Sequence, residues 1–215
     1  MSSKFKYFEY FKTPTWQAQF PGYIKLVDKV CDEYIKDAKK KAAKDMALRK
    51  KFVKKNMKDF GMSFHSTDLY KDPRLKSFVD FVGIKSCEFL EWCGFDLRNF
   101  NPHFSEMWVQ EFAKSGGGHH NTHVHYNNHV SGFYFLKCSP KTSFPVLHDP
   151  RPGAMMTKLP QKNVTKLSYA NEAINFRPSP GTLIIFPAYV PHEFVLDGGA
   201  EPFRFIHFNI VALPR

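Results

Sequence analysis

Hydrophobic residues recur at steps of three and four positions in the first half of the chain. One such stripe runs through residues 22–58 and a second through residues 72–93. This spacing puts the apolar side chains on one face of an α-helix, so it predicts two amphipathic helices that pack on a core. Pro73 suits the first turn of the second helix and Gly94 suits its end. The first stripe consists of Leu26, Val27, Val30, Tyr34 and Ala38, and the second of Leu75, Phe78, Val79, Val82, Phe89 and Leu90.

After about residue 104 the pattern changes from helical spacing to short apolar runs. These runs are rich in aromatic and β-branched residues, and Gly, Pro, Asn and Asp separate them, which is typical of strands joined by turns. The segment 138–180 is rich in proline and polar residues and predicts a long loop with one or two short strands. The predicted strands are residues 106–112, 131–137, 181–187, 192–196 and 203–213.

The elements together predict a mainly β protein with N-terminal helices. We expect residues 1–104 to form a helical part that packs on a β core of residues 105–215, as one fused unit. A chain of 215 residues with 43% hydrophobic residues and 23 Phe can build a large core. No apolar run is long enough for a transmembrane helix. The first 14 residues lack the apolar stretch of a secretory signal.

The positive charge is concentrated in one segment. Residues 36–60 contain 11 Lys or Arg against 3 Asp, which accounts for 8 of the net +11. The segment is either a solvated lysine-rich helix or a surface that docks on nucleic acid or an acidic partner. The few cysteines predict reduced thiols and a cytoplasmic protein, because none stands in a CxxC pair. They are Cys31, Cys87, Cys93 and Cys138.

Five of the ten histidines lie within residues 119–129. His123 and His125 stand two positions apart, and alternate side chains of a strand point to the same face. Two imidazoles placed in this way can bind neighbouring positions of one metal ion. The other three of the five, expected at the surface or as neighbours that orient the ligands, are His119, His120 and His129.

A third ligand must come from elsewhere in the chain. His192, which follows a strand-like run, is the best candidate, and His207 and His148 are alternatives. Arg204 lies in an otherwise apolar strand, so an inward guanidinium would need an anion there. If its strand neighbours that of His192, Arg204 would clamp a carboxylate beside the metal.

These features resemble the iron(II)- and 2-oxoglutarate-dependent oxygenases of the prolyl-hydroxylase-like kind. The likeness is closest to a subgroup found in bacteria and their phages, in which His-x-His replaces the usual His-x-Asp. It covers about residues 62–210. The motifs are THVH (122–125), SGFYFL (131–136), HDPR (148–151), GTLIIFP (181–187), PHEF (191–194), FRF (203–205) and HFN (207–209).

The resemblance implies a double-stranded β-helix, or jelly roll, and a dioxygenase that hydroxylates a substrate C–H bond. Fe(II) would be bound by His123, His125 and His192. The co-substrates would be O2 and 2-oxoglutarate, which is converted to succinate and CO2. Arg204 would pair with the distal carboxylate of 2-oxoglutarate.

Two positions depart from the broader pattern of these enzymes. His125 stands where most of them have a carboxylate, which favours a centre of three histidines. Phe135 stands where many relatives have a Tyr that helps to bind 2-oxoglutarate, so Ser131 on the same strand face becomes the candidate that assists Arg204. Arg151, in the long loop, is a candidate for substrate contact.

Two other classes of protein remain as alternatives. Three histidines on a β scaffold also describe a zinc hydrolase or hydro-lyase, although such an enzyme does not need an inward Arg204. A cupin-like binding module that docks through residues 36–60 on nucleic acid or an acidic protein would need no turnover. The substrate class is open, and the basic segment slightly favours a macromolecule over a small molecule.

Overall fold

The computed structural model describes residues 6, 8–52, 59–156 and 159–215. The first predicted helix is divided into α1 (Ile24–Lys41) and α2 (Ala43–Arg49), and the end of the predicted span, residues 53–58, lies outside the described residues. The second begins as a 3-10 turn, η3 (Pro73–Leu75), and continues as α3 (Lys76–Trp92). Two shorter helices are η1 (Pro21–Tyr23) and α4 (Pro152–Met156).

The two long helices bury their predicted apolar faces to different degrees. Of the predicted stripe in α1, Val27 and Val30 are buried and Tyr34 and Ala38 are partly buried, whereas Leu26 is 40% exposed. Cys31 and Ile35 complete the buried face of α1. In α3 the stripe is buried through Phe78, Val82, Phe89 and Leu90. The start of η3 is capped, because the Asp72 side chain accepts a hydrogen bond from the Arg74 backbone N–H at 2.9 Å.

In the described residues, ten strands form two antiparallel sheets. The order of the six-stranded sheet is β1-β8-β5-β10-β3-β2, and that of the four-stranded sheet is β4-β9-β6-β7. All five predicted strands are present, and the long loop contains the two short strands β6 and β7. The bounds are β1 (Trp16–Gln19), β2 (Ser63–His65), β3 (Phe100–Phe112), β4 (His120–His123), β5 (Val130–Lys137), β6 (Pro145–His148), β7 (Ala173–Asn175), β8 (Thr182–Pro187), β9 (His192–Phe194) and β10 (Arg204–Pro214).

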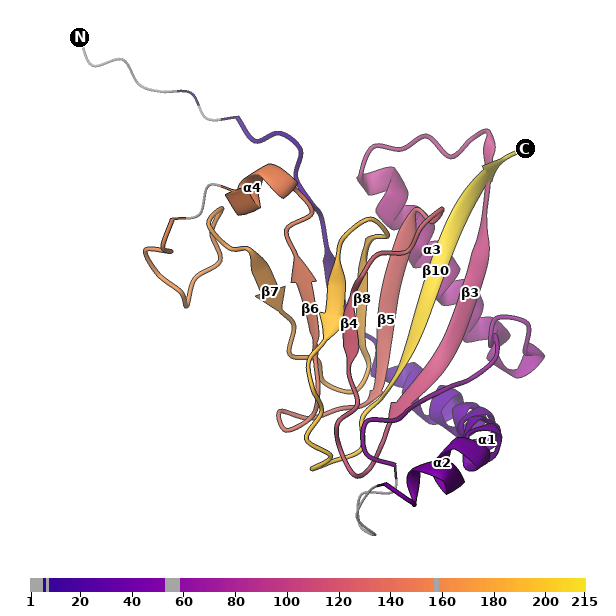
Figure 1. Ribbon diagram of the computed structural model, residues 1–215. Coiled ribbons are helices and arrows are strands. Elements are labelled where there is room, and N and C mark those ends of the chain that lie inside the picture. Colours follow the sequence, from indigo (N-terminus) through magenta and orange to yellow (C-terminus); the bar gives the residue numbers. More distant parts are fainter. Residues whose placement is uncertain (1–5, 7, 53–58, 157–158) are drawn as a thin grey trace.

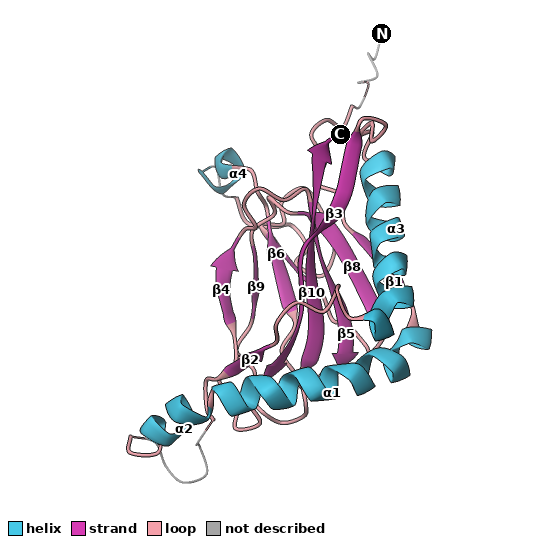
Figure 2. Ribbon diagram, turned by 90° about the vertical axis from the view of Figure 1, so that its right-hand side faces the viewer, coloured by secondary structure: helices cyan, strands magenta, loops and turns pink. Residues whose placement is uncertain are grey.

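The molecule is layered, with α1 and α3 against one face of the six-stranded sheet and the four-stranded sheet against the other (Figures 1 and 2). One core lies between the helices and the large sheet, and a second, rich in Phe, lies between the two sheets. The N-terminal part is less purely helical than we expected, because β1 pairs with β8 and β2 pairs with β3. The prediction of a mainly β fold with N-terminal helices is confirmed.

The side chains of β10 alternate between these two cores. Phe203, just before the strand, and Phe205 belong to the core between the sheets, while Ile206, Phe208 and Ile210 belong to the core under the helices. The alternation is that of a regular strand. It therefore decides which residues of β10 can reach a site between the sheets.

Candidate metal centre

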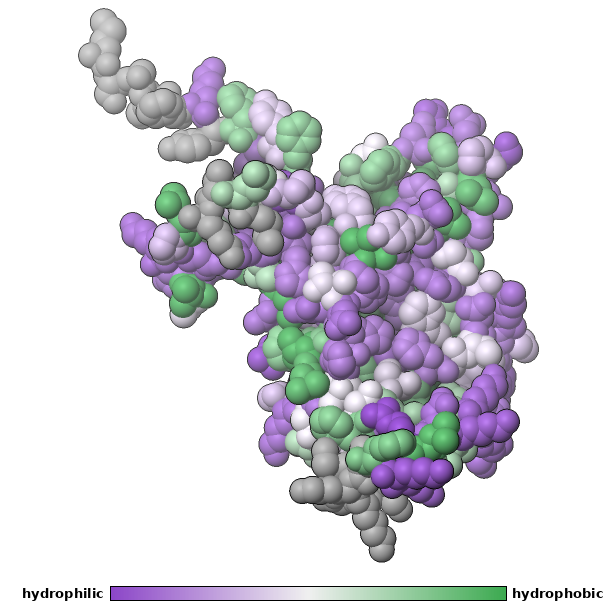
Figure 3. Space-filling model, viewed as in Figure 1, coloured by the Kyte–Doolittle hydropathy of each residue, from purple (hydrophilic) through white to green (hydrophobic). Residues whose placement is uncertain are grey.

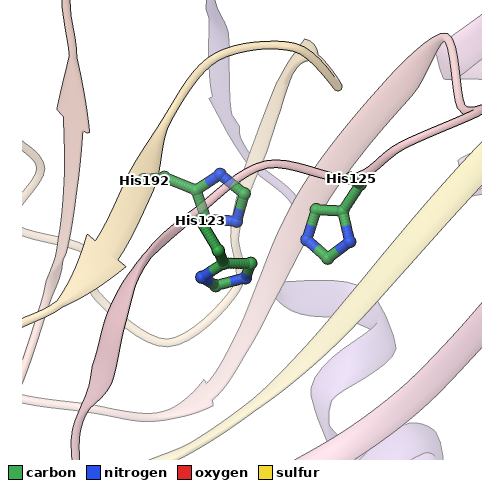
Figure 4. Close-up of side chains that lie close together, drawn as sticks. All are labelled: His123, His125 and His192. Atoms are coloured by element: carbon green, nitrogen blue, oxygen red, sulfur yellow. The ribbon is translucent and has the colours of Figure 1, made fainter.

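The structure brings His123, His125 and His192 together at one end of the space between the sheets (Figure 4). His123 ends β4 and pairs with His192, the first residue of β9, while His125 lies two residues beyond the end of β4. The ring centroid of His123 is 4.4 Å from that of His192 and 5.0 Å from that of His125. One nitrogen of each ring lies within 4.8 Å of the other two, so a single ion can reach all three.

The Nδ1 atoms of the three rings all face protein groups. Nδ1 of His123 lies 2.7 Å from the Asn121 carbonyl oxygen, and Nδ1 of His192 lies 2.9 Å from that of Val190. Nδ1 of His125 lies 3.6 Å from a carboxylate oxygen of Glu106. Contacts of this kind hold a metal-binding histidine in the tautomer that leaves Nε2 free for the ion.

The donor set fits a transition metal. Nε2 of His125 and Nε2 of His192 are buried and have no hydrogen-bond partner, which is costly unless a ligand occupies the space between them. Burial lowers the pKa of His192 to about 3 and lowers the pKa of His123 below its usual value. Both imidazoles are therefore neutral at physiological pH, which is the form that binds iron or zinc.

A fourth histidine lies next to the triad. The ring of His207 is 4.4 Å from that of His125 and 4.4 Å from that of Trp108, and neither of its nitrogens has a partner. Burial lowers its pKa well below the usual value. His207 is an alternative third ligand on the sequence pattern, but the three histidines that one ion can reach together include His192 and not His207.

A hollow of about 10 Å³ opens beside His123 and His192, which is room for about one water molecule. Buried polar atoms without partners belong to its wall, among them Nε1 of Trp108 and Oε1 of Gln110. Sequence reasoning missed both residues, although the alternation of EMWVQEF would have placed them on one face with Glu106. The lining consists of Trp108, Gln110, His120, His123, Phe133, His192, Phe194, Phe205 and His207.

The remaining histidines have separate surroundings. His120 stacks at 5.5 Å on His65, and burial lowers the pKa of His120 to about 3. Nδ1 of His129 accepts a hydrogen bond from the Ala212 backbone at 3.1 Å, so His129 ties two segments of the large sheet together. His119 is exposed and lies 3.1 Å from the Gly117 carbonyl oxygen through Nδ1. His148, the second alternative ligand, faces Glu193 at 3.4 Å instead of the triad.

Arg204 is not at the metal site, and its predicted role as a carboxylate clamp there is wrong. Its strand lies in the six-stranded sheet, whereas β9 with His192 lies in the four-stranded one, so the two strands are not neighbours. Arg204 also points to the helix side of the sheet, since its neighbours Phe203 and Phe205 take the side of the triad.

The guanidinium of Arg204 is instead saturated by acidic residues of this chain. It donates to Glu111 at 2.8 and 2.5 Å, to Asp28 at 2.6 Å and to Asp32 at 2.7 Å. Burial opposes its charge, but Asp32, Glu111 and Asp28 outweigh that effect and raise the pKa of Arg204. The network ties α1 to β3 and β10. An arginine with these partners has no donor directed toward a ligand between the sheets.

Ser131, the residue predicted to assist Arg204, is also engaged elsewhere. Ser131 does face the space between the sheets, but its hydroxyl donates to the side chain of Asn209 and cannot assist Arg204 on the opposite face. Phe135 is fully buried in the core between the sheets. Among the described residues, those that line the hollow include no lysine or arginine.

Arg151 lies on a separate and much larger groove of about 820 Å³. The groove runs between residues 8–15, the N-terminal arm, and the segment 147–176. Val190, whose carbonyl oxygen contacts His192, also belongs to its lining. The guanidinium of Arg151 donates to Asp149 at 2.9 and 2.6 Å. On the face shown in Figure 3 the surface is mostly hydrophilic, with hydrophobic patches on the arm, where Phe11 is 93% exposed.

The comparison with known families covers the segment that contains these elements. Residues 106–209 match the family described as "Putative 2OG-Fe(II) oxygenase", where 2OG stands for 2-oxoglutarate. Over this segment the chain is similar to that oxygenase family. The matched segment includes all three histidines of the triad and most of both sheets. No curated protein matches the chain.

Solved structures have a fold similar to that of this chain. AviO1 from Streptomyces viridochromogenes Tue57 is 12% identical with a TM-score of 0.55, and the match covers 93% of this chain and 90% of that one. A prolyl-4-hydroxylase from Pseudomonas putida is 13% identical with a TM-score of 0.50, and 91% of each chain is covered. The two antiparallel sheets are accordingly a double-stranded β-helix. None of the helices in the described ranges is long and apolar enough to cross a membrane.

Proposed function

We propose that this protein is a non-haem iron oxygenase in which His123, His125 and His192 bind Fe(II) and a 2-oxo acid serves as co-substrate with O2. The observation that carries the proposal is the triad: three nitrogens within 4.8 Å of one another, in a segment similar to the 2OG-Fe(II) oxygenase family. Imidazole suits iron, and the buried Nε2 atoms without partners favour an occupied centre. The substrate is unassigned.

Bound Fe(II) would supply the redox chemistry by which O2 and the 2-oxo acid together hydroxylate a substrate C–H bond, with succinate and CO2 formed from 2-oxoglutarate. The protein's own part is to orient and to exclude water. Phe133, Phe194 and Phe205 line the hollow next to the ligands and keep bulk water from that side. Trp108 and His207 offer hydrogen-bonding atoms to a molecule bound beside the metal.

The fit to 2-oxoglutarate itself is incomplete. The family implies 2-oxoglutarate, but the group predicted to bind its distal carboxylate, Arg204, is occupied on the other face of the sheet. Without an ion pair at that end, the protein should discriminate weakly between 2-oxoglutarate and a 2-oxo acid that lacks the second carboxylate. A charge-assisted bidentate contact is the interaction that would otherwise separate them.

The test is to load the protein with Fe(II) without oxygen, add 2-oxoglutarate, and then record the visible absorption band that this pair produces when both bind one centre. Turnover is then measured as release of CO2, for 2-oxoglutarate and for 2-oxobutyrate in parallel. We expect a band in the wild type and none in His192→Ala, with the two acids used at rates within about tenfold of each other. Full turnover in His192→Ala would refute the site assignment.

A zinc-dependent hydrolase or hydro-lyase is the second candidate, and the position of Arg204 favours it. An arginine that points toward the metal would argue against a zinc hydrolase or hydro-lyase, and Arg204 points to the other face of its sheet. Three neutral histidines with an open position are also the ligand set of a catalytic zinc that activates water. Tight zinc binding, together with no absorption band and no CO2 release with Fe(II), would select this candidate.

A further inference from the structure

A centre of three imidazoles has no negative charge of its own. The usual facial arrangement for iron has two histidines and one carboxylate, and the carboxylate offsets part of the charge of the metal. In this chain His125 stands at the carboxylate position. A negative charge near this centre would therefore have to come from a residue outside the triad.

Glu106 on β3 is placed to do so. Its carboxylate oxygen lies 3.6 Å from Nδ1 of His125, the ring nitrogen opposite the one that can reach the ion. The side chain of His125 is only 12% exposed and that of Glu106 is 35% exposed, so solvent screens the contact incompletely. A glutamate side chain ordinarily carries a negative charge at physiological pH.

Other side chains fix the position of this carboxylate. The Asn209 side-chain amide donates a hydrogen bond to Glu106, and the Ser131 hydroxyl donates to the oxygen of the same Asn209 amide. Ser131 and Asn209 are fully buried, on the neighbouring strands β5 and β10. A chain of hydrogen bonds thus runs from buried Ser131 through buried Asn209 to Glu106, whose carboxylate contacts the predicted metal ligand His125. Buried polar groups satisfied in this way hold one geometry.

We propose that Glu106 is a positioning residue of the metal centre. Glu106 orients His125 through Nδ1, and through this histidine it supplies the negative charge that a directly bound carboxylate would otherwise supply. The arrangement is a carboxylate–histidine–metal relay, in which the outer carboxylate makes the histidine a more basic ligand. The proposal rests on the metal site of the proposed function, and it holds for iron or zinc whichever reaction follows.

The test is metal binding by the whole chain, measured by competition with a chromophoric chelator, for the wild type and Glu106→Gln. This substitution keeps the size and removes the charge. We expect the affinity for Zn²⁺ and Fe²⁺ to fall about 10- to 100-fold. The Fe(III)/Fe(II) reduction potential should rise, because losing a nearby negative charge destabilises Fe(III) more than Fe(II). A role in folding alone would leave that potential unchanged.

Glu193→Gln is the matched control. Glu193 also faces a histidine, His148 at 3.4 Å, with a similar exposure of 31%, but His148 is not in the triad. The metal affinity and the Fe(III)/Fe(II) reduction potential of Glu193→Gln should equal those of the wild type. Glu106→Asp keeps the charge and should bind metal more tightly than Glu106→Gln. The proposal fails if Glu106→Gln binds as the wild type does, if Glu193→Gln loses as much, or if the Asp and Gln variants lose equally. Zinc binding that responds as expected in a protein without oxygenase turnover would overturn only the proposed reaction.

Discussion

Arg204→Met is the substitution that most sharply separates a structural arginine from a co-substrate clamp. The Arg204 side chain is 5% exposed and pairs with Glu111, whose side chain is 7% exposed. Removing one partner of a buried ion pair costs about 3–5 kcal/mol, because the other charge stays buried without compensation. Glu111 keeps Lys39, and Asp28 keeps Lys137, so the expected loss lies at the lower end, about 3 kcal/mol.

For a chain of this size, about 3 kcal/mol lowers the Tm by about 6–12 °C. Scanning calorimetry of the metal-free protein measures this shift. The affinities for zinc and for 2-oxoglutarate, measured by titration calorimetry at a temperature where the variant is folded, should stay within about twofold. Arg98→Met is the control, since the Arg98–Asp96 pair is exposed (87% and 56%) and should leave the Tm nearly unchanged. An unchanged Tm with loss of 2-oxoglutarate binding would falsify the structural role of Arg204.

Three further predictions concern the sheet, the acid limb of stability and the basic segment. Gly132→Ala should lower the free energy of unfolding by about 2–3 kcal/mol in chemical denaturation, because a Cβ would overlap the Phe208 ring and overpack the core. Hydrogen bonds from Arg74 lower the pKa of Asp72 to about 2, so the stability that Asp72 contributes is present above its unfolded pKa of about 4 and is lost as the pH falls toward 2. Asp72→Asn should therefore show a smaller fall in Tm between pH 4 and pH 2 than the wild type, and an equal fall would contradict the assignment. If residues 36–60 dock on nucleic acid, the affinity for a labelled oligonucleotide should drop steeply between 50 and 200 mM salt. Weak binding with an affinity that does not change with salt would exclude nucleic acid as the partner.

Local sequence patterns were enough to predict most of the elements. The helical stripes, the five strands and the two short strands in the long loop follow from spacing and turn residues, which act over a few positions. The HxH pair was also predictable, because its two side chains are neighbours along the backbone. His192 was found through its motif, and the structure places it opposite His123 across a sheet.

The failures concern contacts between distant segments. The orientation of Arg204 depends on the alternation of β10, where a shift of one residue exchanges the two faces of the sheet. Apolar residues occupy both faces of that strand, so the FRFIHFN pattern does not show which face is which. The sequence by itself determined the type of fold and three histidines that could hold a metal ion. Only the tertiary structure decided that acidic residues of α1 and β3 bind Arg204, and that Glu106 stands behind His125, because both pairings join residues far apart in the chain.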